Sequence, residues 1–170
     1  KGLNQSIALA RAGSCVYHVG TIGTDGESLR KALVENGVDT HFVFRRPCLS
    51  AHTVIQVNDA GENCILFYRD PALALTESEL NQIFAHFDGG DWLLTQNEMA
   101  HGPYVMHLAK ARGMRIAWNP SPLDTQIETY PMELVDLFLL NALEAQTLSG
   151  CESIDACVQA LHRRFPQACL

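Results

Sequence analysis

The sequence has few positive charges. Twelve Lys and Arg residues are set against nineteen Asp and Glu, which gives a net charge of -7 at pH 7. A protein that binds nucleic acid through the phosphate backbone needs an excess of positive charge. We therefore expect no nucleic-acid partner. A nucleotide remains compatible with this charge, because a few backbone amides and one or two side chains can hold a triphosphate with its metal ion.

Long hydrophobic runs are also absent. No apolar stretch, the one at residues 135–140 included, approaches the roughly 20 residues that span a bilayer. The chain does not open with the charged, apolar and small-residue pattern of a secretory signal peptide. These observations predict no membrane partner and a cytoplasmic location.

The cysteines and histidines lack the spacings of metal and disulfide sites. Six cysteines occur without a C-x-x-C pair, and seven histidines occur without H-x-x-x-H or H-E-x-x-H spacing. A disulfide framework or a zinc site therefore has little support. Because several of the cysteines lie inside apolar runs, we predict reduced cysteines buried in the core.

Strands and helices alternate along the 170 residues, a length typical of one domain. Apolar periodicity, with glycines after several helical runs, predicts helices at residues 4–11, 27–36, 76–87, 103–112, 142–149 and 154–165. Short apolar runs predict strands at 15–19, 92–95, 116–118 and 135–140, and the polar link NDAGEN predicts a β-hairpin within 51–68. The pattern indicates an α/β fold, with a mostly parallel central sheet, helices on both faces and an added hairpin.

Polar residues follow three of the predicted strands. They are Glu98 in the run QNE, Asn119 before a proline, and Asn141 with Glu144 three residues later. Ligands of open α/β sheets bind beyond the carboxyl ends of the strands, so these groups could meet a polyhydroxylated ligand and a metal together. Each also has a purely structural explanation: Asn141 as a helix cap, Asn119 as part of a turn, and Glu144 as the partner in a capping box.

The opening residues KGLN form another candidate site. They place Lys1 and Gly2 in a loop and Asn4 at the start of a helix, where unpaired backbone donors and a long amine can face a ligand's oxygens. The alternative is a solvated lysine on a disordered chain end.

Taken together, the motifs resemble those of the ribokinase-like (PfkB) family of carbohydrate and nucleoside kinases. KGLNQSIALARAG resembles the second half of the family's first signature, and VGTIGTDGESLRKALVENGVDT is similar to its strand, G-x-D-G loop and helix. HTVIQVNDAGENCILFY resembles the hairpin that contributes a lid over the sugar. TQNEMA, WNPSP and LLNALEAQTLSG then resemble the sugar-contacting segment, the N-P-A-P turn and the N-x-x-E motif, in the family's order.

The resemblance implies phosphoryl transfer from ATP to a sugar hydroxyl. It implies that Lys1, Gly2, Asn4 and Glu98 bind the sugar. It assigns Asn141 to the nucleotide and Glu144 to Mg²⁺ through water, and it leaves a monovalent cation open. Ribose is the first substrate expected, with fructose phosphates, other ketoses and nucleosides as alternatives. A homodimer that pairs through the lid hairpin is a further expectation.

The sequence departs from the family pattern in several places. YRDPALAL stands where a P-G-A-N-x-x-L stretch is usual, and Leu3 replaces an alanine, which leaves the substrate open. The first strand with its sugar-binding aspartate and the D-T-x-G-A-G-D signature do not occur in residues 1–170. We therefore expect a partial kinase domain whose catalytic base lies beyond Leu170, with no catalytic residue and no activity in this chain alone. The rival interpretation is a sugar- or nucleotide-binding α/β protein without catalysis.

Overall fold

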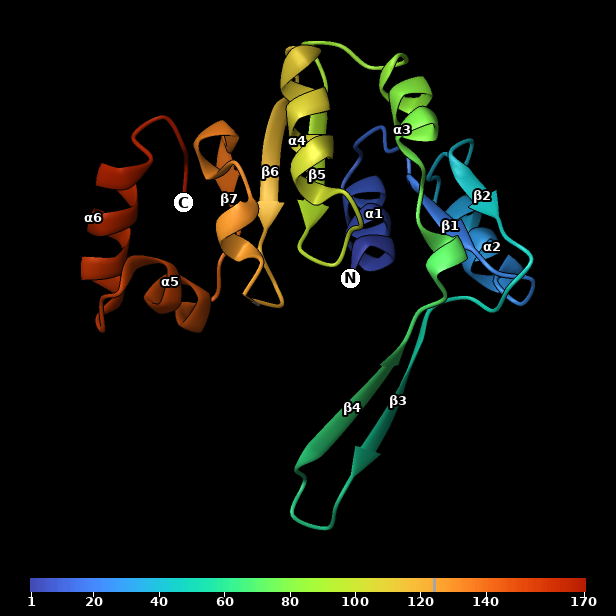
Figure 1. Cartoon of the computed structure of the whole chain (residues 1–170), viewed down its shortest axis with the longest axis horizontal. Helices are drawn as coiled ribbons and strands as arrows, with labels where there is room; N and C mark the ends of the chain where they lie inside the picture. Colours follow the sequence, from blue (N-terminus) through green and yellow to red (C-terminus); the bar gives the residue numbers. More distant parts are fainter. Residues whose placement is uncertain (124) are drawn as a thin grey trace. The chain divides into compact units, whose positions relative to one another are not determined.

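The computed structural model describes residues 1–123 and 125–170 (Figure 1). Two compact units make up the chain, Lys1–Thr76 and Glu77–Leu170. Each unit contains parallel strands and helices, which confirms the α/β fold class. No helix in the described part of the chain is long and apolar enough to cross a membrane.

The first unit is built on a pair of short parallel strands. Gly20 pairs with Val43 and Ile22 with Arg45. Leu33 and the nearby Val38 and Phe42 are buried in its core. The elements are α1 (Gly2–Arg11), β1 (Gly20–Ile22), α2 (Glu27–Glu35), β2 (Val43–Arg45), β3 (His52–Val57), β4 (Asn63–Tyr68) and the 3₁₀ helix η1 (Pro71–Leu73).

The predicted position of the first strand is wrong. Within residues 15–19 only Tyr17 pairs, in an isolated bridge to Asp39, and the strand itself begins at Gly20. Cys15 and Tyr17 are exposed, so the apolar run does not form a continuous buried strand. Strand β2 was not predicted, because three residues ending in an arginine give almost no periodicity.

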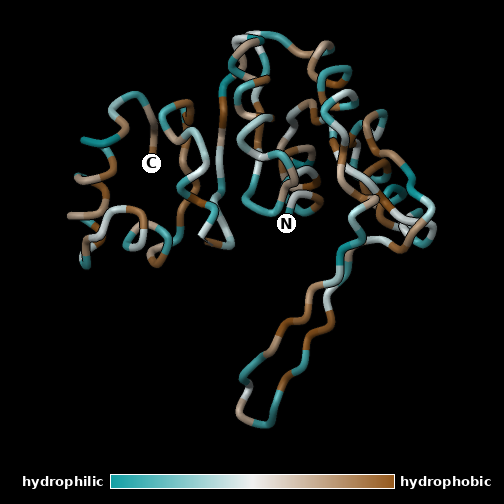
Figure 2. Tube along the Cα trace, viewed as in Figure 1, coloured by the Kyte–Doolittle hydropathy of each residue, from teal (hydrophilic) through white to brown (hydrophobic). Residues whose placement is uncertain are grey.

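The β-hairpin is confirmed, with antiparallel pairing from His52 opposite Tyr68 to Val57 opposite Asn63. Asn58 closes its turn: the side-chain carbonyl accepts from the amides of Ala60 and Glu62 at 3.0 and 2.9 Å. Every residue of both strands is exposed. Figure 2 shows hydrophobic stretches along both strands of the hairpin.

The second unit contains a three-stranded parallel sheet in the order β5, β6, β7. Its strands are β5 (Trp92–Gln96), β6 (Arg115–Asn119) and β7 (Leu137–Phe138). Its helices are α3 (Glu77–Phe84), α4 (Gly102–Ala111), α5 (Ala142–Ser149) and α6 (Ile154–Arg164), with 3₁₀ turns η2 (Ile127–Thr129) and η3 (Met132–Leu134). The predicted helix at 76–87 ends earlier, because the amides of His86 and Phe87 form tighter i to i-3 bonds. The predicted strand at 135–140 shortens to two residues.

Aromatic side chains form much of the second core. Trp118 is fully buried and stacks on Tyr130 with ring centres 4.9 Å apart, and Phe138 lies between Trp118 and Phe165 at 6.0 and 5.1 Å. The Asp136 carboxylate accepts from Lys110 Nζ of α4 at 2.5 Å and from the Ile116 amide of β6 at 2.7 Å. These contacts attach α4 and β7 to the central strand.

The prediction of core cysteines is largely wrong. All six cysteines are free, but only Cys157 is buried, while Cys15, Cys64 and Cys169 are exposed. The apolar runs that contain them lie in hairpin and bridge segments with little cover, so an apolar neighbour was a poor guide to burial.

Candidate functional site

The carboxyl ends of β5, β6 and β7 form one edge of the sheet in the second unit. Two asparagines connect the loops at this edge. The Asn97 side-chain amide donates to the Pro122 carbonyl at 2.7 Å, and the Asn119 side-chain amide donates to the Leu139 carbonyl at 2.7 Å. Each loop is therefore fixed to the next, which gives a rigid polar rim where ligands of open α/β sheets bind.

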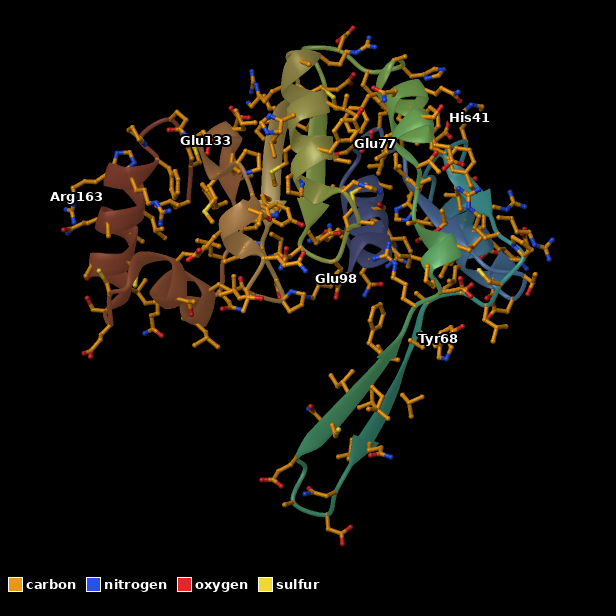
Figure 3. All side chains as sticks on the ribbon, viewed as in Figure 1. His41, Tyr68, Glu77, Glu98, Glu133 and Arg163 are labelled. Atoms are coloured by element: carbon orange, nitrogen blue, oxygen red, sulfur yellow. The ribbon has the colours of Figure 1, made fainter. Side chains whose placement is uncertain are left out.

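Glu98 lies in the turn that follows β5 and precedes α4 (Figure 3). Its residue is exposed, so its carboxylate can be reached from solvent. The turn is held at Asn97, whose side chain bonds to the Pro122 carbonyl and whose own carbonyl lies 3.5 Å from the Tyr130 hydroxyl. The fold thus presents an accessible carboxylate on a fixed turn at the rim.

Asn141 and Glu144 form a capping box at the start of α5. Asn141 Oδ1 accepts from the Glu144 amide at 2.9 Å. Glu144 accepts from the Asn141 backbone and side-chain amides at 3.1 and 2.9 Å. The capping box that the sequence left open as an alternative is therefore present, and its hydrogen bonds fix both residues beside the end of β7.

The described residues do not by themselves assemble a metal site. No group of three or more His, Cys, Asp or Glu side chains is placed to hold an ion within residues 1–123 and 125–170. A carboxylate is a suitable ligand for Mg²⁺. However, the Glu144 residue is only 5% exposed, and both its oxygens already accept hydrogen bonds from Asn141. Direct coordination by Glu144 does not fit this arrangement.

Lys1, Gly2 and Asn4 belong to the first unit, at the start of α1. Lys1 precedes the helix without capping it through its side chain, and Lys1 and Asn4 are exposed. The first turn of a helix offers backbone amides without intrahelical partners, as a ligand-binding loop requires. The expectation that these residues join Glu98, Asn141 and Glu144 at one sheet edge stays a prediction.

Two polar features were missed at the sequence level. Ser6 Oγ lies 2.8 Å from His18 Nδ1, and burial lowers the pKa of His18. Among the described buried side-chain nitrogens and oxygens, Trp118 Nε1 lacks a hydrogen-bond partner. A serine inside a helix and a histidine in an apolar run give no signal that they pair, because the contact depends on tertiary packing.

The sequence matches the pfkB family of carbohydrate kinases over residues 1–168. The chain belongs to this family. It is 30% identical over 160 residues to the ribokinase of Haemophilus influenzae, covering 91% of this chain and 52% of that protein. The mouse ribokinase is 26% identical, with 88% and 48% covered. The chain thus spans about half the length of these curated relatives.

Solved structures support the same fold. The ribokinase of Arabidopsis thaliana, solved with ribose and ATP, superposes with a TM-score of 0.79 at 22% identity, covering 98% of this chain and 57% of that one. The ribokinase of Cryptococcus neoformans var. grubii, solved with ADP, gives 0.74 at 25% identity, covering 95% and 54%. The ribokinase-like fold expected from the motifs is confirmed.

Proposed function

We propose that the full-length protein transfers a phosphoryl group from ATP to a hydroxyl of a sugar, with ribose the first candidate. The main support is the family match over residues 1–168, together with relatives that are named ribokinases. One relative was solved with ribose and ATP and another with ADP. The polar rim beyond β5, β6 and β7 is consistent with this chemistry, since phosphoryl transfer depends mainly on positioning and charge neutralisation.

In this proposal Glu98 accepts hydrogen bonds from sugar hydroxyls, and Lys1, Gly2 and Asn4 contribute donors to the sugar. A carboxylate that accepts two such bonds discriminates against analogues that lack a hydroxyl. The exposure of Glu98 on a fixed turn supports its part.

Asn141 is proposed to orient the phosphates of ATP, and Glu144 to act through water on the Mg²⁺ that ATP brings with it. The capping box supports positioning, because it fixes both side chains at the start of a helix. Glu144 acts here only through a bound water, since its oxygens are already engaged. Dependence on a monovalent cation belongs to the same proposal and calls for residues outside those described.

The direct test is sugar-dependent ADP formation by the full-length protein. We expect turnover with ribose. We expect none from the 170-residue chain alone, because it spans about half of its relatives and we place the catalytic base outside it. Turnover by the chain alone would disprove the second statement. A full-length protein that binds a sugar or ATP but forms no ADP would favour the non-catalytic interpretation.

We also propose that the hairpin β3–β4 forms a homodimer contact. Its support is the exposure of every strand residue, including Val54, Ile55, Leu66 and Phe67, on both faces of an isolated ribbon. A two-stranded ribbon of this kind is marginal in water unless it packs on something else. Sedimentation of the full-length protein should give a dimer that becomes a monomer when Val54 and Phe67 are both changed to Ser; an unchanged mass would refute the dimer contact.

We propose a reducing, cytoplasmic location, which the free cysteines support.

A further inference from the structure

The loop that follows β1 is joined to the segment that leads into the hairpin. The Gly23 amide donates to Ser50 Oγ at 2.9 Å, and the Ser50 amide donates to Asp25 Oδ1 at 2.8 Å. Between these two loop residues, the Thr24 amide donates to the Cys48 carbonyl at 2.8 Å. Ser50 is only 6% exposed. The bonds run in both directions, so loop 23–26 and segment 48–50 form one clamp.

The two glycines of this loop are required by the close approach. A Cβ atom at Gly23 would lie 2.2 Å from the Ser50 nitrogen and 2.4 Å from the Cys48 oxygen, both of them backbone atoms. A Cβ atom at Gly26 would lie 2.6 Å from Ser50 Oγ. Such distances are far inside van der Waals contact, so only glycine allows the two segments to approach each other. The two glycines of the G-T-D-G motif are therefore explained by the close packing of segment 48–50 against this loop.

The returning strand of the hairpin is attached to the same part of the unit. Thr21 Oγ1, in β1, donates to the Leu73 carbonyl at 2.6 Å. Leu73 is 4% exposed, and Asp70 caps η1 by accepting from the Ala72 amide at 2.8 Å. Between the two attachments every residue from 51 to 69 is exposed. The change from buried to exposed is abrupt after Ser50, whereas on the returning side Asp70 is half-buried and Pro71 and Ala72 are exposed before the buried Leu73.

The clamp carries a charged acceptor. The pKa of Asp25 is lowered, first by the hydrogen bond from the Ser50 amide and then by the Ser50 hydroxyl, with His52 adding a smaller effect. A lowered pKa means that the bond is present at neutral pH and is lost as the pH falls through the folded-state pKa of Asp25. The Asp25 carboxylate is therefore charged at neutral pH. The substitution Asp25→Asn removes its charge while keeping one acceptor oxygen.

We propose that loop 23–26 is the fixed base of the hairpin, and that Asp25 and Ser50 are positioning residues that set its direction. The hinge lies at residues 51–52 on one strand and 69–70 on the other. Because every residue from 51 to 69 is exposed, the orientation of the hairpin depends on this base. The inference rests on the proposed function in one respect: the hairpin acts as a lid that encloses the sugar. Correct closure then requires an intact clamp.

Amide hydrogen exchange on the full-length protein tests the clamp. Asp25→Ala is expected to speed exchange of the Ser50 and Gly23 amides about tenfold or more, since it removes a hydrogen bond to a charged acceptor. Asp25→Asn should give a smaller increase. The matched control is Asp39→Asn, whose carboxylate accepts from the His41 amide at 2.7 Å elsewhere in the unit. It should leave both amides unchanged.

The cross-strand amides of β3 and β4 should keep their rates in every variant, because the hairpin pivots as a unit. Unchanged exchange at Ser50 and Gly23 in both Asp25 variants, or equal acceleration by Asp39→Asn, would overturn the clamp. This readout does not depend on any enzyme activity, so it remains decisive if the protein is not a sugar kinase.

Kinetics test the positioning role separately. We expect Asp25→Ala to raise the sugar KM about fivefold to tenfold with little change in the KM for ATP, as the loss of one hydrogen bond affects only lid closure. Asp25→Asn should recover most of the loss, and Asp39→Asn should behave as wild type. Faster exchange without any change in the sugar KM would overturn the positioning role while leaving the proposed function intact.

Discussion

Replacing Glu98 by alanine in the full-length protein is expected to raise the KM for the sugar by roughly 10–100-fold, because hydrogen bonds to a charged acceptor are each worth about 1.5–3 kcal/mol. The KM for ATP should change by less than about threefold, since the nucleotide is assigned to Asn141. Glu98→Gln should have a smaller effect, because it keeps one acceptor. The measurement is initial-rate kinetics with each substrate varied in turn.

Glu128→Gln is a suitable control for this series. Glu128 is an exposed carboxylate in η2 of the same unit and does not follow a strand. The substitution removes one negative charge outside the polar rim, so both KM values should stay at their wild-type levels. Equal increases in the two KM values on changing Glu98 would exclude it from the sugar site.

The second prediction with a large expected effect concerns Asn141. Ser153 caps another helix of the same unit and serves as the comparison. Asn141 caps α5 by accepting from the Glu144 amide at 2.9 Å, and Ser153 caps α6 by accepting from the Ala156 amide at 3.3 Å. Ser153→Ala should lower the free energy of unfolding by about 1 kcal/mol, the usual value of a cap. Asn141→Ala should lower it by more, because it also removes the bond from the Asn141 side-chain amide to the buried Glu144 carboxylate. Only Asn141→Ala should also raise the KM for ATP, by about tenfold, since a bond to a charged phosphate is lost.

The comparison separates function from stability. Thermal unfolding gives the loss of stability in each variant, and kinetics give the KM for ATP. If both variants lose stability and neither changes the KM for ATP, Asn141 serves only as a cap. The structural explanation would then suffice.

Features that depend on near neighbours in the sequence were largely predictable. The polar turn at Asn58, the glycines after α1 and α2, and the Asn141 to Glu144 spacing all act within a few residues. Local hydrogen bonding determines such features, so the residue types suffice to locate them. The capping box was foreseen as an alternative to a ligand site, and it is present.

Features that depend on long-range packing were not predictable. The bonds from Asn97 to Pro122 and from Asn119 to Leu139 join loops that are 25 and 20 residues apart. The clamp between Asp25 and Ser50 likewise joins residues 25 apart. The mistaken strand at 15–19 has a related cause, because pairing depends on the neighbouring segment around Asp39 and not on apolar content alone.

The most direct test of the proposed function is a crystal structure of the full-length protein with ribose and a non-hydrolysable ATP analogue. We predict that ribose hydroxyls lie within about 3.2 Å of the Glu98 carboxylate, the upper limit of a good hydrogen bond. The phosphates of the analogue should lie at the start of α5, beside Asn141. Ribose bound away from the turn after β5, or an analogue bound away from α5, would contradict the account.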